Sequence, residues 1–589
     1  MPAQTIPQAL DATALACPDI PALRWKEEGA WQSLTWSAYR RQVRLAARGF
    51  MALGLEPGKG VAIVGNNCPE WFVADLAAVH AGGLPSGIYA TFVPEQCRYI
   101  ARHCEAQIAV VENAEHLAKF LAIRADLPHL RAIVQMHGDA GGPGVLTWEE
   151  LLRRGHEVPE SDVDARVGAL SPGDVATLIY TSGTTGEPKA VMLTHDNVTW
   201  TADVGISALG LRAGDNILSY LPLSHIAEQL VSLFGPVVFG GTTWFAESME
   251  KLGDNLREVR PDFFLGVPRV WEKMQERMQA AGAQNPALRK RLIAWARGVG
   301  MRGGYADQQG KRRPLLYPLA NALVFRKVRQ RLGLDRARIL VTSAAPIARS
   351  TLEFFLSLGL PICEVYGMSE CTGPGTISTP GRYRTGKAGR AFPGAELKTA
   401  SDGEICMRGR HVFRGYYKDP AGTADALDAE GWLHSGDIGE LDAEGFLQIT
   451  DRKKDLIITA GGENVAPQLV EGYLKAIPVV SQAVVVGDRQ RYLGVLLTLD
   501  PARVPVDAEA AGSPARDVAA AATCAKFRAY LQAHIDAVNA RLARVQAVKR
   551  FEIIAGEFTV EGGELTPSLK VRRKAVAEKY ATEIARLFA

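Results

Sequence analysis

Residues 180–195 read Tyr-Thr-Ser-Gly-Thr-Thr-Gly-Glu-Pro-Lys-Ala-Val-Met-Leu-Thr-His and follow a predicted buried strand at residues 175–180. Gly183 and Gly186 allow the backbone to turn sharply and to bring N–H groups close to an anion. Lys189 adds a cation for a polyphosphate, and neighbouring hydroxyl side chains add donors. The segment is not a Walker A motif, because lysine does not directly follow the second glycine. It therefore predicts a phosphate-binding loop of another kind.

The chain around this loop alternates short apolar runs with helical patterns. Residues 61–64 and 108–111 read as buried strands, and residues 69–80 read as an amphipathic helix between them. Repeated strand–helix–strand units predict an α/β fold in which helices cover both faces of a mostly parallel sheet.

The composition changes towards the C-terminus. Residues 440–450 read as a hairpin, and the charged run Asp-Arg-Lys-Lys-Asp follows at residues 451–455. Charged residues between two pairs of strands indicate an exposed hinge. We therefore expect a large domain over residues 1–450 and a small α+β domain over residues 451–589.

Charge and cysteine pattern restrict the function classes. The 589 residues carry 67 Lys+Arg and 64 Asp+Glu, so the net charge is +3, and 47% of the residues are hydrophobic. These values are typical of a soluble globular enzyme and exclude a disordered chain, a collagen-like fibre and a disulfide-stapled scaffold. The near-neutral balance argues against nucleic-acid binding. Eight scattered cysteines, and an N-terminus without a signal-peptide pattern, favour a cytoplasmic protein with reduced thiols.

The loop at residues 180–195 closely resembles the signature of the AMP-forming adenylating enzymes, which include acyl-CoA synthetases, firefly-type luciferases and peptide-synthetase adenylation domains. Ala190 departs from the pattern, because the family usually has glycine there, but no phosphate ligand is lost. Residues 264–272 and 451–467 resemble the long-chain, bubblegum-like branch of fatty acid–CoA ligases. The resemblance implies a large N-terminal domain of mostly parallel sheets and a distorted β-barrel, followed by a small mobile C-terminal domain.

The same resemblance implies a nucleotide site. Residues 342–346 (Thr-Ser-Ala-Ala-Pro) and 364–370 (Glu-Val-Tyr-Gly-Met-Ser-Glu) resemble the adenine site and the metal-carboxylate motif. Glu370, with Thr184, is expected to hold Mg²⁺ on the triphosphate. Asp437 is expected to accept hydrogen bonds from the ribose hydroxyls. The residues implied for ATP and AMP binding are Thr181, Ser182, Gly183, Thr184, Thr185, Gly186, Lys189, Ser343, Ala344, Glu364, Tyr366 (as a stacking face), Gly367, Asp437, Arg452 and Lys570.

Two motifs match the family's C-terminal domain. Asp451 falls at the hinge position, and residues 565–573 resemble the loop of the adenylation lysine, here Lys570. Leu569 stands where many relatives have glycine, a replacement typical of the long-chain branch. By resemblance, the small domain swings about the hinge and presents a second segment to CoA. The residues expected on the CoA side are Gly461, Gly462 and Glu463.

An acyl pocket is implied as well, because residues 221–229 resemble the segment that borders it in the family. The uncharged residues 229–246 are long enough to suggest a membrane span, but their glycines and proline favour buried strand-and-turn segments. Trp244 either gates the acyl tunnel or packs in the core. The residues expected at the pocket are His225, Trp244, Gly266 and Val267.

Residues 285–331 form a basic stretch. Apolar residues recur within it at helical spacing, namely Leu288, Leu292, Trp295 and Val299. A basic amphipathic helix can lie on anionic lipid, into which fatty acids partition, and this leaves open a peripheral contact with the inner membrane surface. The alternative is a solvated charged face that packs on the large domain.

The reaction implied has two halves. A fatty carboxylate attacks the α-phosphorus of ATP to give acyl-adenylate and pyrophosphate, and the CoA thiol then releases AMP. Because a carboxylate and a polyphosphate repel each other, the first half needs cations, which Mg²⁺, Lys189 and Lys570 would supply. The expected catalytic residues are Lys570, Glu370, Thr184 and Lys189.

Three alternatives stay open at this point. One is the same fold with another acceptor, as in an acyl-AMP ligase, a luciferase-like oxygenase or a carrier-loading adenylation domain. Another is an aryl or medium-chain acid as substrate. The last is a catalytically inactive protein that binds nucleotide or a membrane surface.

Overall fold

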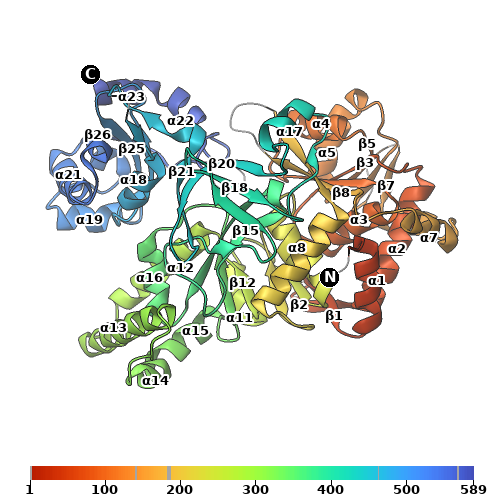
Figure 1. Cartoon of the computed structure of the whole chain (residues 1–589), viewed down its shortest axis with the longest axis horizontal. Helices are drawn as coiled ribbons and strands as arrows, with labels where there is room; N and C mark the ends of the chain where they lie inside the picture. The colour runs from red at the N-terminus through yellow and green to blue at the C-terminus, as the bar shows by residue number, and fades with distance from the viewer. Residues whose placement is uncertain (1–2, 140–141, 143, 182–186, 462, 567–569) are drawn as a thin grey trace.

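A computed structural model describes residues 3–139, 142, 144–181, 187–461, 463–566 and 570–589. Figure 1 shows the small C-terminal part, drawn in blue, beside the strands β20 (Leu433–Leu441) and β21 (Leu447–Arg452) of the larger body. The architecture is α/β, as the sequence predicts.

The first sheet holds both strands that flank the phosphate loop. In the described part of the chain it runs in the order β19-β9-β8-β4-β3-β5-β6-β7. Its strands are β19 (Gly415–Tyr416), β9 (Lys189–Thr194), β8 (Val175–Thr181), β4 (Leu84–Ile88), β3 (Gly60–Val64), β5 (Ala106–Val111), β6 (Ala132–Gln135) and β7 (Val145–Thr147). Strands β4, β3, β5, β6 and β7 pair in parallel, whereas β8 and β9 form an antiparallel hairpin. The predicted strands at residues 61–64 and 108–111 are confirmed.

The second sheet forms the other wall of the site and runs in the order β16-β15-β14-β13-β12-β10-β11-β1-β2 over the described residues. Its strands are β16 (Arg390–Ala391), β15 (Gly373–Ile377), β14 (Ile362–Met368), β13 (Ile339–Thr342), β12 (Phe263–Leu265), β10 (Asn216–Ser219), β11 (Thr242–Phe245), β1 (Pro21–Glu27) and β2 (Ala30–Thr35). The run from β14 through β13, β12 and β10 to β11 is parallel, so the carboxyl ends of these strands meet at one edge.

The third sheet is antiparallel, in the order β17-β18-β20-β21, and stands where a distorted barrel is expected. Its first two strands are β17 (Glu396–Thr399) and β18 (Glu404–Arg408). The predicted hairpin at residues 440–450 joins β20 to β21, and the backbone N–H of Gly445 donates to Asp442 in its turn.

The C-terminal part has its own apolar clusters, which contain residues from Ile457 onward. Strands β24 (Val480–Val486), β25 (Leu493–Leu499) and β26 (Val548–Ile553) form its sheet, and β22 (Ile457–Ile458) pairs with β23 (Asn464–Val465). Asp451 lies at the end of β21 and is buried, whereas an exposed hinge was expected. The domain boundary at residue 451 stays a prediction.

Helices cover the sheets on both faces (Figure 1). Those of the larger body are α1 (Ile6–Ala16), α2 (Trp36–Ala52), α3 (Pro69–His80), α4 (Pro94–His103), α5 (Ala114–Ile123), α6 (Trp148–Gly155), α7 (Glu160–Gly168), α8 (His195–Leu209), α9 (Ile226–Glu228), α10 (Gly235–Phe239), α11 (Leu252–Val259), α12 (Pro268–Ala283), α13 (Ala287–Gln308), α14 (Tyr317–Ala320), α15 (Arg326–Leu332), α16 (Arg349–Leu356) and α17 (Pro420–Ala426). Those of the C-terminal part are α18 (Pro467–Leu474), α19 (Val504–Ala510), α20 (Val518–Thr523), α21 (Ala525–Asn539), α22 (Arg573–Lys579) and α23 (Ala581–Phe588).

Three sequence predictions are corrected by these elements. Helix α3 has the predicted bounds but is not amphipathic, because every residue from Trp71 to His80 is buried. Residues 229–239 are helical, with a π-helical segment (Gln229–Phe234) before α10, and only β11 is a strand there. The apolar residues of the basic stretch do not share one environment, because Leu288 is exposed whereas Val299 is buried.

No helix in the described ranges is long and apolar enough to cross a bilayer.

Candidate functional site

A cavity of about 2230 Å³ lies between the edges of the three sheets and the C-terminal part. It brings together ten of the predicted site residues, which are far apart in the sequence. They are Thr181, Lys189, His225, Ser343, Ala344, Gly367, Glu370, Asp437, Arg452 and Lys570.

The phosphate loop enters this cavity through its flanking strands. Thr181 ends β8 and Lys189 begins β9, so the hairpin fixes both ends of the loop. The Lys189 ammonium lies 3.3 Å from the Asp419 carboxylate. Ala190, which stands where the family usually has glycine, is buried in β9. The predicted ligands Ser182, Gly183, Thr184, Thr185 and Gly186 lie outside the described residues.

The proposed metal carboxylate, Glu370, lies in a short turn directly after β14. Its side chain is buried at the cavity wall, and burial raises the pKa of its carboxyl group. Its Oε1 accepts a 2.7 Å hydrogen bond from the Tyr416 hydroxyl. Gly367, near the end of β14, lies so close to the Gly373 carbonyl that a Cβ would not fit there.

Asp437 and Arg452 face each other directly across β20 and β21. Their side chains form an ion pair, with 3.4 Å between Arg452 Nε and Asp437 Oδ1. Asp437 Oδ2 accepts a 2.7 Å hydrogen bond from the Tyr366 hydroxyl. The carboxylate is therefore held from two sides at the cavity surface, with lone pairs left for other donors.

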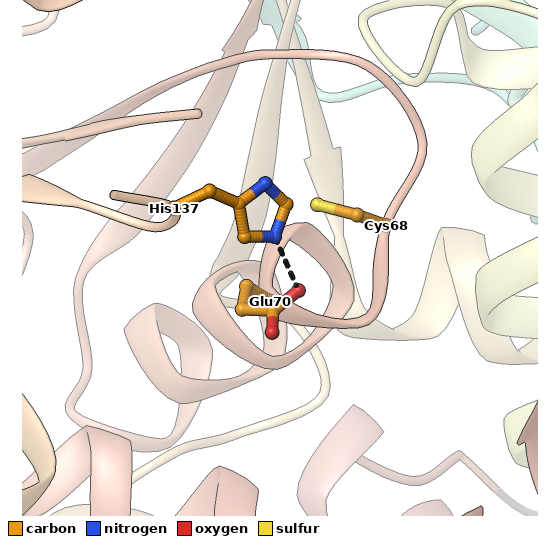
Figure 2. Close-up of side chains that lie close together, drawn as sticks. All are labelled: Cys68, Glu70 and His137. Atoms are coloured by element: carbon orange, nitrogen blue, oxygen red, sulfur yellow. Dashed lines mark hydrogen bonds and ion pairs between the residues drawn. The ribbon is translucent and has the colours of Figure 1, made fainter. Parts of the chain in front are cut away.

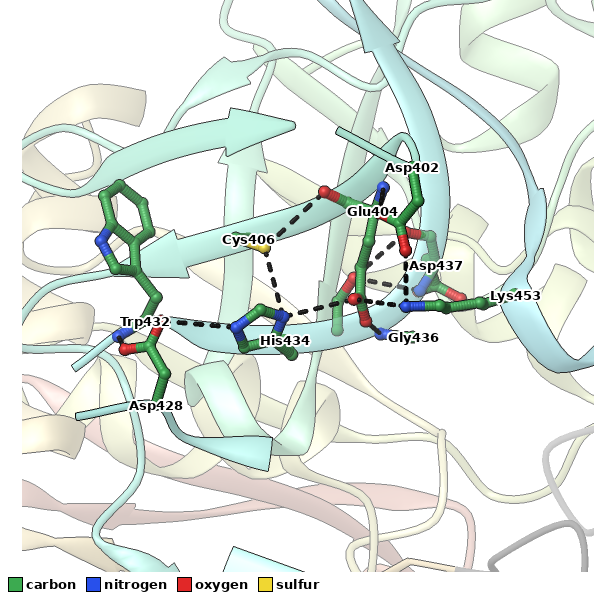
Figure 3. A network of polar contacts seen from close by, with 10 residues as sticks. Asp402, Glu404, Cys406, Asp428, Trp432, His434, Gly436, Asp437 and Lys453 are labelled. Carbon is green, nitrogen blue, oxygen red and sulfur yellow. Dashed lines mark hydrogen bonds and ion pairs between the residues drawn. The ribbon is translucent and has the colours of Figure 1, made fainter. Parts of the chain in front are cut away.

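A polar network holds the strand of Asp437 in place (Figure 3). The buried Glu404 carboxylate accepts hydrogen bonds from the Gly436 N–H at 2.9 Å and from Lys453 at 3.0 Å. Lys453 also reaches Asp402 at 2.7 Å, and His434 lies 3.2 Å from Glu404. Because Lys453 directly follows Arg452, these ion pairs tie the end of β21 to β18 and β20.

Lys570 projects into the cavity from a loop closed by two hydrogen bonds between Thr566 and Lys570. Burial, together with the nearby Arg452 charge, lowers the pKa of its ammonium group to about 8. The carboxylates of Asp437 and Glu370 act in the opposite direction. Lys570 thus lies within electrostatic reach of both proposed nucleotide carboxylates.

His225 borders the cavity at the start of α9, where its Nδ1 accepts a 3.1 Å hydrogen bond from the Ala227 N–H. Burial lowers the pKa of the imidazole to about 4, and the Lys570 charge adds to this. The ring is therefore neutral at physiological pH. His225 is therefore an uncharged part of the cavity lining.

Five described residues that were predicted for the nucleotide and acyl sites do not line the cavity. Along β14, side chains alternate, so Val365 and Gly367 face the cavity while Glu364 and Tyr366 point away. Glu364 accepts a hydrogen bond from the Gly386 N–H instead. Trp244 lies in another apolar cluster, where its indole N–H donates to Asn216. The remaining two are Gly266, which abuts the Trp271 ring, and Val267.

The predicted CoA-side segment lies outside the cavity in this arrangement. Gly461 and Glu463 are exposed in a turn before β23, and Gly462 lies outside the described residues. Asp451, the predicted hinge, accepts hydrogen bonds from the Arg452 N–H and, at 2.9 Å, from the Gln468 N–H at the start of α18. Lys570 is therefore inside the cavity while the other segment is outside.

Comparison with known proteins agrees with this geometry. The model of the AMP-binding enzyme family matches residues 10–417, and that of the AMP-binding enzyme C-terminal domain matches residues 454–589. The chain belongs to the AMP-binding enzyme family. It is 42% identical to the long-chain-fatty-acid–CoA ligase ACSBG2 of Xenopus laevis, covering 99% of this chain and 84% of that protein. It is 40% identical to ACSBG1 of Bos taurus, with 98% and 84% covered.

Solved structures share the fold of this AMP-binding enzyme. The adenylation domain of a carboxylate reductase from Mycobacterium chelonae superposes with a TM-score of 0.77 at 20% identity, covering 100% of this chain and 92% of that one. A Mycobacterium tuberculosis fatty acyl CoA synthetase superposes with a TM-score of 0.64 at 21% identity, covering 98% and 99%.

Among the cavity residues that sequence reasoning missed in this AMP-binding enzyme are Tyr416 and Lys454. Tyr416 follows a glycine in β19, and its contact with Glu370 depends on strand pairing that no local pattern reveals. Lys454 belongs to the charged run, and burial lowers the pKa of its ammonium group. In this run only Asp451, as hinge, and Arg452, as nucleotide contact, are assigned from the sequence.

A second cluster of chemically active side chains lies away from the cavity. Figure 2 shows Cys68, Glu70 and His137 turned toward one another, with their ligand atoms within 4.8 Å. His137 Nε2 and Glu70 Oε2 already form a 3.2 Å ion pair, and the buried Cys68 thiol packs 3.7 Å from the Met136 sulfur. Cys68 also caps α3, whose positive end opposes a cation. We assign no metal to this group.

The ionisation of Lys570 can be tested directly. Its reaction with an amine-specific reagent, followed by mass spectrometry of the labelled peptide, should show a midpoint near pH 8, because only the neutral amine reacts. Arg452→Ala should move the midpoint to higher pH, since a like charge is removed, and Glu370→Gln should move it lower. A midpoint near that of free lysine, about 10.4, would contradict burial of this amine.

Proposed function

We propose that this AMP-binding enzyme is an ATP-dependent long-chain fatty acid–CoA ligase. One observation carries the proposal: a single cavity is lined both by the polar group around Lys570, Glu370 and Asp437 and by apolar side chains of α8, α10 and β12, whose part of the cavity we call the apolar channel. The names of the relatives, at about 40% identity over nearly the whole chain, support the same reaction.

In the first half-reaction, the cavity would hold ATP with its ribose on Asp437 and its phosphates near Lys189. The Lys570 ammonium would lie between the fatty carboxylate and the α-phosphate and reduce their repulsion. The buried Glu370 carboxylate would hold Mg²⁺, with Thr184, which lies outside the described residues, expected as a second oxygen donor, and the ion would supply charge neutralisation on the triphosphate. Tyr366, buried behind Asp437, would orient that carboxylate rather than stack on adenine.

The apolar channel supports a long acyl chain. It runs along α8, which lines it from Thr201 to Leu209, a length of roughly 12 Å at 1.5 Å per residue. Leu265 and Phe263 of β12 line it as well, and because β12 runs toward the nucleotide edge, Phe263 marks the deeper end. Phe239 of α10 also lines the channel.

In the second half-reaction, the small domain would rotate about Asp451. The present arrangement, with Lys570 inside and Gly461 and Glu463 outside, suits adenylation. Rotation would exchange the two segments and admit the CoA thiol. The alternative is an acyl-AMP ligase or another adenylating enzyme with a different acceptor, which the same cavity would serve.

ATP–pyrophosphate exchange that depends on long-chain fatty acid, together with acyl-CoA formation when CoA is added, tests the function. Lys570→Ala should abolish exchange yet retain most of the thioester formation from supplied acyl-adenylate. The exposed Lys549→Ala, in the same domain, is the matched control. Exchange without acyl-CoA product would favour the alternative acceptor. Equal loss of both half-reactions in Lys570→Ala would contradict the proposal that Lys570 acts in adenylation only.

Chain-length selection should depend on Gly205. This glycine lies midway along the channel face of α8, and a Cβ there would be 3.8 Å from the Phe392 ring. Gly205→Leu should therefore obstruct the deeper half and lower kcat/KM for long acids roughly 10- to 100-fold while sparing short ones. Ser207→Leu adds the same side chain on the exposed face of α8 as a control. Parallel losses for all chain lengths would contradict the channel.

We also propose that the region of α13–α15 contacts anionic membrane. Leu315 and Leu288 are 98% and 80% exposed, which is unusual for leucine, and Figure 1 shows α13 and α14 at the edge of the molecule. The exposed leucines of this region are Leu288, Leu292, Leu315, Leu316, Leu319 and Leu323. Exposed basic residues lie among them, namely Arg289, Lys290, Arg291, Lys311, Arg312, Arg326 and Lys327. Apolar insertion with basic neighbours suits a surface of anionic lipid.

Flotation with liposomes tests this contact. The wild type should float with vesicles that contain phosphatidylglycerol and less with phosphatidylcholine alone. Leu315→Asp combined with Leu319→Asp should abolish flotation, whereas Leu15→Asp, at a leucine that is 85% exposed on α1, should not. Flotation that is unchanged in the double variant would contradict the proposal.

A further inference from the structure

One side chain touches both the proposed metal carboxylate and the phosphate-loop lysine. The Tyr416 hydroxyl donates to Glu370 Oε1 at 2.7 Å, and the Lys189 ammonium lies over the Tyr416 ring, 4.6 Å from its centroid. Tyr416 lies at the cavity wall between the two. The hydroxyl at the edge of the ring makes the first contact and the face of the ring makes the second, so both can exist together.

The backbone holds Tyr416 in this position. Strand β19 pairs with β9, with Tyr416 opposite Val191, two residues after Lys189. The Tyr416 N–H donates to the Thr423 hydroxyl at 2.8 Å, and the Phe413 ring packs edge-on at 4.9 Å. Gly415, at φ 139° and with Thr423 too close for a Cβ, allows the chain to enter the strand here.

We infer that Tyr416 is a positioning residue that sets the geometry between the Glu370 carboxylate and Lys189. A hydroxyl on Oε1 fixes the rotation of a buried carboxylate and leaves lone pairs for an ion. The ring offers Lys189 a partner that does not need to be exchanged when the lysine leaves Asp419 for a phosphate. This inference rests on the proposed function, because it concerns binding of the Mg²⁺ complex of ATP.

Two variants separate the contacts. Tyr416→Phe removes the hydroxyl and keeps the ring, whereas Tyr416→Leu removes both. Equilibrium binding of a fluorescent ATP analogue is measured while Mg²⁺ is titrated. Tyr416→Phe should need about 5- to 10-fold more Mg²⁺ than the wild type for half-maximal enhancement of binding, because one net hydrogen bond is lost. Affinity without Mg²⁺ should stay unchanged in Tyr416→Phe and fall about 2- to 5-fold in Tyr416→Leu.

Tyr417→Phe is the matched control, because the neighbouring ring packs against His103 and Lys418 and does not line the cavity. The KM for fatty acid should stay the same in Tyr416→Phe, and thermal unfolding should confirm that each variant is folded. The same Mg²⁺ dependence in Tyr416→Phe and wild type, or an equal shift in Tyr417→Phe, would overturn this inference and leave the proposed function untouched. A wild type that binds no ATP would remove the proposed function, and this inference with it.

Discussion

The Asp437–Arg452 pair is the contact on which the arrangement of the site depends. It joins two neighbouring strands of the third sheet at the cavity, and the chain leaves for the C-terminal part directly afterwards. A carboxylate and a guanidinium held face to face allow two further groups, Glu370 and Lys570, to lie near them without a large excess of either charge. Removing either partner would leave the other charge uncompensated in a confined space.

Further contacts in the larger body hold β20, the strand of Asp437, beside Arg452. Glu404 accepts hydrogen bonds from the backbone beside Asp437 and from Lys453 beside Arg452, so one buried carboxylate holds both ends of the pair. The two large sheets meanwhile bring Lys189 and Glu370 to the same opening from separate directions. The site is thus a meeting point of three sheets.

The sequence predicted the parts of the fold that follow from local pattern. Buried strands β3 and β5, the bounds of α3 and the hairpin at residues 440–450 all follow from apolar periodicity and turn residues. The pattern could not show that α3 is buried on all sides, because helices that pack on it from elsewhere in the chain cover its polar residues Asp75 and His80. Motif order located ten cavity residues. It failed for Tyr366 and left Trp244 open between the channel and the core, because strand alternation and sheet pairing decide which face a side chain takes.

The burial of Asp451 has a mechanical consequence. Its carboxylate accepts the N–H of Gln468, so it completes the first turn of α18 although it stands sixteen residues before that helix. If the small domain rotates about Asp451 as proposed, the residue at the pivot is hydrogen-bonded to α18, and this helix would move together with it. Rotation would then strain the bonds of Lys453 and Arg452 to the larger body, and the motion would take place between two discrete positions rather than as a continuous drift.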